Sequence, residues 1–69
     1  MKNVYNVLIE QDDDGWFVSD VVGLPGCHTQ AKSLDELMKR TKELIVEYLE
    51  ATKGKTIQEK FIGLQQIEV

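Results

Sequence analysis

The sequence predicts an α+β fold with the element order β-β-β-α-β. Three observations support this: alternating apolar segments separated by turn residues before residue 32, a helical apolar repeat in residues 34–52, and a final apolar segment at 61–69. Short turns make the first three strands antiparallel, and a helical crossover returns the last strand parallel to a neighbour. We therefore expect a mixed sheet of three antiparallel strands plus one parallel strand, with one helix packed on one face.

The first strand is predicted at residues 4–10, which are rich in β-branched and aromatic side chains. Alternation places Tyr5, Val7 and Ile9 on one face of this strand. The acidic segment 11–15 follows and ends in an Asp-Gly pair that suits a tight hairpin turn.

A second strand is predicted at residues 16–21. Because one helix covers only one face of the sheet, the other face should carry either Trp16 and Val18 or Phe17 and Val21. An apolar face without a covering layer would mark an interaction site.

Residues 22–26 interrupt the pairing, because Pro25 lacks an amide donor and two glycines permit unusual backbone angles. Leu24 can anchor this turn to the core. A short third strand is predicted at residues 27–31.

The helix begins at a capping box, in which the Ser33 hydroxyl and the Glu36 carboxylate satisfy amide donors. Glu36 and Arg40 form a favourable pair four residues apart. Lys53 in the last turn and Gly54 just beyond it predict the end of the helix. An apolar stripe at three-and-four spacing predicts the core face, with Leu34, Leu37, Met38, Thr41, Leu44, Ile45, Tyr48, Leu49 and Thr52. The last strand is predicted at residues 61–69.

A chain of 69 residues forms one small domain, here residues 1–69, whose core needs additional support. Cys27 is the only cysteine, which excludes an internal disulfide, and His28 is the only histidine, which excludes a four-ligand zinc site built from one chain. We therefore expect a homo-oligomer, a dimer or tetramer, and no cofactor or metal.

Eight basic against twelve acidic residues give a net charge of −4, which disfavours direct nucleic-acid binding. The apolar runs are too short for a transmembrane helix or signal peptide. With no disulfide potential, the sequence favours a cytoplasmic protein that does not bind membranes.

No catalytic site is expected. Asp12, Asp13 and Asp14 lack the alternate spacing of a calcium loop, so they form either a solvated hairpin tip or a contact to a basic partner. Adjacent strand residues point to opposite faces, so Cys27 and His28 cannot readily share a proton. Together with the acidic turn, the segment Trp16, Phe17 and Val18 is the candidate partner or oligomer interface.

The chain resembles the HicB-like antitoxin family. The resemblance lies in residues 5–10, the acidic turn before Trp16, and the order Leu24-Pro25-Gly26-Cys27-His28-Thr29-Gln30 followed by Ser33-Leu34-Asp35-Glu36. It implies a partial ribonuclease-H-like fold and an antitoxin that neutralises a HicA-like toxin, a small basic protein that cleaves messenger RNA. Ala31 and Lys32 depart from the glycine and acidic residue usual before the helix. Many relatives carry a C-terminal DNA-binding segment, which we do not expect here.

Ribonuclease H chemistry needs carboxylates that converge on two divalent ions. Here Glu10, the acidic turn, Glu43, Glu47 and Glu68 are spread over separate elements, so we expect no nuclease activity. Two function classes remain. One is a HicA/HicB-type (type II) antitoxin acting by protein–protein binding, and the other is an orphan homo-oligomeric scaffold or protein-binding module without enzymatic activity.

Overall fold

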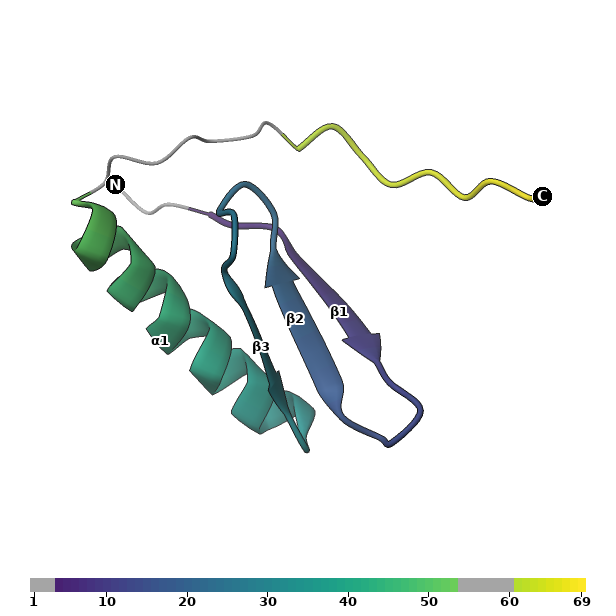
Figure 1. The fold of residues 1–69 in the computed structure, drawn as a ribbon, viewed down its shortest axis with the longest axis horizontal. Helices are drawn as coiled ribbons and strands as arrows, with labels where there is room; N and C mark the ends of the chain where they lie inside the picture. Colours follow the sequence, from purple (N-terminus) through teal and green to yellow (C-terminus); the bar gives the residue numbers. More distant parts are fainter. Residues whose placement is uncertain (1–3, 54–60) are drawn as a thin grey trace.

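A computed structural model describes residues 4–53 and 61–69 (Figure 1). Three strands, β1 (Val7–Gln11), β2 (Phe17–Val21) and β3 (His28–Ala31), precede a helix, α1 (Leu34–Thr52). The sheet has the order β1-β2-β3, and both neighbouring pairs are antiparallel. The α+β class, the three antiparallel strands and the helix after them are confirmed.

The first strand is shorter at its start than predicted. It begins at Val7 rather than Val4, whose side chain is 86% exposed. The regular register starts with Val7 opposite Val21, and one further bond joins the Val22 amide to the Asn6 carbonyl, so residues 4–6 lead into the sheet. Tyr5 still packs against the core cluster.

The β1–β2 turn is held by the side chain of Asp12. Its Oδ1 atom accepts hydrogen bonds from the backbone N–H groups of Asp14 and Trp16, each with a nitrogen–oxygen distance of 2.9 Å. Gly15 adopts a φ of +86°, a left-handed conformation that residues with a Cβ rarely adopt. The Asp-Gly pair thus closes the hairpin as the sequence predicts.

The β2–β3 connection is anchored by Leu24, which is 1% exposed. The Leu24 amide donates to the Val21 carbonyl, the Cys27 amide donates to the Leu24 carbonyl, and the Val21 amide donates to the Cys27 carbonyl. Gly26 has a φ of +79°. This tight loop aligns β3 beside β2.

The Ser33 half of the predicted capping box is confirmed, because the Ser33 hydroxyl accepts the Glu36 amide at 3.2 Å at the start of helix α1. Among the described residues, the Glu36 carboxylate accepts no backbone amide, so the second half of the box is not formed. The Glu36 carboxylate pairs with Arg40 at 2.6 Å. The helix ends at Thr52, and Lys53 caps it with a left-handed φ of 54°. Gly54, the other predicted stop signal, lies outside the described residues.

The core lies between α1 and the strands β2 and β3, because the helix runs beside β3 and contacts both strands (Figure 1). Val7 of β1 packs against this core from its margin. Its buried apolar side chains are Val21, Leu24, Cys27, Ala31 and Leu37.

Only part of the predicted helical stripe is buried. Leu37 and Thr41 are buried, whereas Leu34 is 48% exposed and Met38 is 42% exposed. The stripe is therefore wider than the surface that β2 and β3 offer.

The predicted fourth strand is wrong for the single chain. Residues 61–69 adopt no regular structure, all are exposed, and the segment extends away from the sheet (Figure 1). The alternating residue pattern is typical of a strand, but a strand forms only where its backbone pairs with the edge of another strand. The pattern alone does not determine whether such an edge is present. Among residues 4–53 and 61–69, the sheet is purely antiparallel rather than mixed.

Candidate functional site: the outer face of the sheet

One face of the sheet lies away from α1, and we call it the outer face. The Ser19 hydroxyl lies 2.8 Å from the Thr41 hydroxyl of α1, so Ser19 points to the helix. Because side chains alternate along strands, the neighbours of Ser19 and their cross-strand partners point outward. The outer face therefore comprises Leu8, Glu10, Val18, Asp20, His28 and Gln30.

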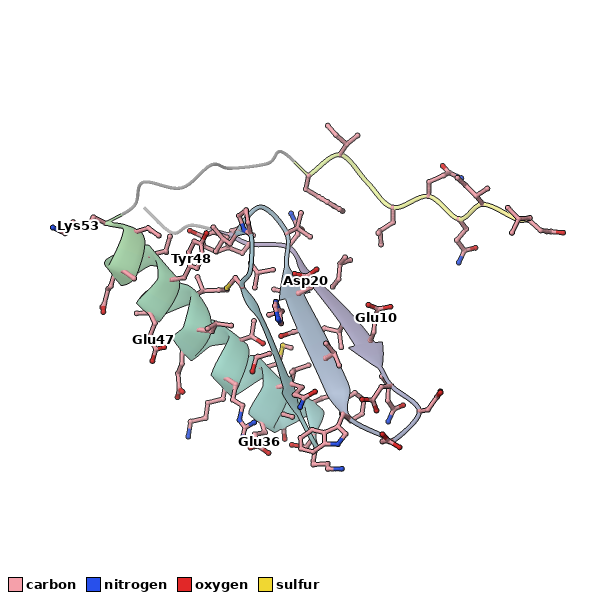
Figure 2. The ribbon with its side chains drawn as sticks, viewed as in Figure 1. Glu10, Asp20, Glu36, Glu47, Tyr48 and Lys53 are labelled. Carbon is pink, nitrogen blue, oxygen red and sulfur yellow. The ribbon has the colours of Figure 1, made fainter. Side chains whose placement is uncertain are left out.

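Apolar and acidic groups alternate across this face. Glu10 lies opposite Val18, and Leu8 lies opposite Asp20. Leu8 and Val18 are half-buried, whereas Glu10 and Asp20 are exposed. Figure 2 shows both carboxylates on the strands of the sheet. The expected apolar face is thus a mixed one, with acidic groups beside a small apolar centre.

Of the predicted interface residues, Trp16 and Val18 lie on the outer side, whereas Phe17 shares the face of Ser19 and Val21. The Lys32 ammonium lies 4.0 Å from the Trp16 ring centroid. A cation at this distance is attracted by the aromatic π system. This contact places a basic group at the end of the outer face nearest the hairpin turn.

The three aspartates of the turn have different roles. Asp12 is a structural residue, because its carboxylate accepts two backbone amides. Asp13 and Asp14 are exposed at the hairpin tip. These two carboxylates remain available to a partner.

Cys27 and His28 do not form a catalytic pair. Cys27 is 0% exposed in the core, whereas His28 is exposed on the outer face. Burial raises the pKa of the Cys27 thiol above its ordinary value of 9.0, and the nearby Asp20 carboxylate raises it further. The thiol therefore stays protonated near neutral pH and lacks the thiolate that a nucleophile requires.

The carboxylates that could be considered for metal chemistry lie on separate elements. Glu10 lies on β1, whereas Glu47 lies on α1 (Figure 2). Within the described part of the chain, no three His, Cys, Asp or Glu side chains are grouped as metal ligands. A hollow of about 300 Å³ borders residues 20–26, where Asp20 is the one ionisable side chain.

Residues 5–67 match the model of the HicB-like antitoxin family of bacterial toxin–antitoxin systems. The chain belongs to this family.

Curated relatives carry a family label without an activity. A UPF0150 protein of Archaeoglobus fulgidus is 57% identical over 65 residues, which cover 94% of this chain and 93% of the relative. A UPF0150 protein of Synechocystis is 38% identical, covering 99% of this chain and 97% of the relative. No solved structure gives a significant match.

In the part of the chain that the structure describes, no helix combines the length and the apolar character needed to cross a membrane.

Proposed function

We propose that this chain is the antitoxin of a HicA/HicB-type (type II) toxin–antitoxin system and neutralises a small basic toxin that cleaves messenger RNA. Family membership over residues 5–67 supports a toxin as the partner. The encounter would take place in the cytoplasm, where the toxin meets messenger RNA. The antitoxin acts by binding and performs no catalysis.

The observation that carries this proposal is the charge pattern of the outer face. Glu10 and Asp20 flank the apolar pair Leu8 and Val18, and the whole chain carries a net charge of −4. A basic RNA-binding surface is complementary to such a face. Complementary charge accelerates association and selects the partner, while the apolar centre slows dissociation.

The interface extends from the outer face to the hairpin tip. Trp16 and Val18 supply apolar contact area, and Asp13 and Asp14 supply carboxylates. Phe17 and Asp12 contribute indirectly, since Phe17 faces the helix side and Asp12 holds the turn. A toxin bound here would have its basic surface covered, so RNA could not reach it.

The proposal is tested by adding the purified chain to a HicA-like toxin encoded beside it and following cleavage of a messenger RNA. We expect inhibition to be complete near one chain per toxin, and the chain alone to leave the RNA intact with magnesium or manganese present. Uninhibited cleavage at a large excess of chain would overturn the proposal.

A homo-oligomeric scaffold or protein-binding module is the second candidate function. The observation that favours it is the exposed apolar segment 61–69. Exposed apolar side chains in one segment are typical of a protein–protein interface. A chain that has no toxin gene beside it and captures only itself would support this candidate.

A further inference from the structure

Among residues 4–53 and 61–69, no strand pairs with the edge of β1 that faces away from β2. The Val22 amide donates to the Asn6 carbonyl, and the Asp12 amide donates to the Trp16 carbonyl. In an antiparallel pair, successive residues direct their backbone N–H and C=O groups alternately toward the partner strand and away from it. The backbone groups of the even-numbered residues between these two bonds therefore point toward β2. The backbone groups of Val7, Ile9 and Gln11 therefore point away from the sheet and can pair with another strand.

The opposite edge of the sheet is partly closed. Arg40 of α1 donates its Nη1 hydrogen to the Gln30 carbonyl at 2.9 Å, which occupies an acceptor on β3. The helix contacts β3 and β2 more closely than β1, whose Val7 reaches the core only at its margin. An added strand is thus better accommodated at β1.

An apolar surface lies beside the free edge. Ile9, on the helix side of β1, is 45% exposed. Helical geometry puts Met38 on the flank of α1 away from Arg40, hence on the β1 side, and it is 42% exposed. A strand placed along β1 would cover these side chains as it paired.

Residues 61–69 have the properties of the missing strand. Ile62, Leu64 and Ile67 are 85%, 76% and 78% exposed. Nine extended residues span about 30 Å, more than the roughly 17 Å of the five residues of β1. The segment projects away from its own sheet (Figure 1), which favours capture by another molecule.

We propose that residues 61–69 of one copy pair as a strand with the β1 edge of a second copy, and that the exchange is reciprocal. In a dimer with a two-fold axis, each β1 edge pairs with the segment 61–69 of the other copy, so the same contact is made twice. The proposal does not depend on toxin binding, because the outer face remains open in such a dimer.

Sedimentation of the full chain at micromolar concentration tests this dimer. Leu64→Asp should weaken self-association by about tenfold or more, because a charge would enter the apolar contact. Gln66→Asp, a matched change on the same side of the segment, should have a much smaller effect. Circular dichroism should report an intact helix in both variants, since the core lies within residues 4–53. A wild-type monomer, or equal effects of both changes, would overturn the proposal.

Cross-linking separates exchange from pairing within one chain. A chain with Gln11→Cys, Gln65→Cys and Cys27→Ser is treated with a short bifunctional maleimide. Exchange predicts a covalent dimer on a denaturing gel. An internally linked monomer would show that residues 61–69 pair with β1 of their own chain, and an unlinked chain that still dimerises would show that the interface lies elsewhere. Either result would contradict the proposal.

Discussion

At the scale of single residues, the most specific contact between sheet and helix is a buried pair of hydroxyl groups. Thr41 donates to the Leu37 carbonyl at 2.6 Å, so its one hydrogen is used. Ser19 must then be the donor in the 2.8 Å contact with Thr41. Ser19 is 0% and Thr41 3% exposed, so water cannot replace either partner. This bond fixes where the helix lies across β2.

Thr41→Val should lower the free energy of unfolding by about 1–3 kcal/mol, because it leaves the Ser19 hydroxyl buried without an acceptor. Urea unfolding measures the change. Thr52→Val is the matched control, since Thr52 also donates to a helix carbonyl four residues earlier but bonds to no strand among the described residues.

Adding Ser19→Ala to Thr41→Val should recover part of the lost stability, because the unsatisfied donor disappears. A double variant as unstable as the sum of the two single variants would contradict this coupling.

The contact between Lys32 and Trp16 was not predicted from the sequence, although it follows from the register of β2 and β3. Phe17 pairs with Ala31, so the next pair outward is Trp16 and Lys32. Placing the centre of the β2–β3 loop at Leu24 gives this register. The sequence indicates the loop at residues 22–26 but does not by itself set the register out to Trp16 and Lys32.

At the scale of elements, local signals predicted the first three strands and the helix. The hairpin turn and the Ser33 cap are each closed by a hydrogen bond between residues three or four positions apart, so the local sequence contains the necessary information. The segment 61–69 differs, because its structure depends on a partner edge. The faces of the strands were also undetermined until the Ser19–Thr41 contact fixed which side meets the helix.

The hairpin turn gives a prediction with a closely matched control. Asp12→Ala should destabilise the fold by about 1 kcal/mol, since two backbone amides lose their acceptor. Asp13→Ala makes the same charge change at an exposed site and should alter stability by less than about 0.5 kcal/mol. Thermal unfolding of both variants measures the difference, and similar losses would argue against a structural role for Asp12.

At the scale of the whole molecule, a family match and a mixed outer face together support a binding protein. Sequence composition predicted the acidic character, and the resemblance predicted the family, which the match over residues 5–67 confirms. Which charges share a face could be told only from the fold. The alternation of side chains is visible in the sequence, but the sequence does not show which of the two faces the helix covers. A single domain at residues 1–69 without a DNA-binding segment stays a prediction, as does the oligomeric state.

Toxin association kinetics test the central claim, that the outer face binds a basic toxin, most directly. Glu10→Lys with Asp20→Lys reverses the outer face, and Glu43→Lys with Glu47→Lys makes the same net charge change on exposed helix positions. At low ionic strength, the outer-face variant should associate roughly tenfold more slowly than the helix variant, and salt should reduce the gap. Equal association rates for the two variants would contradict binding through this face.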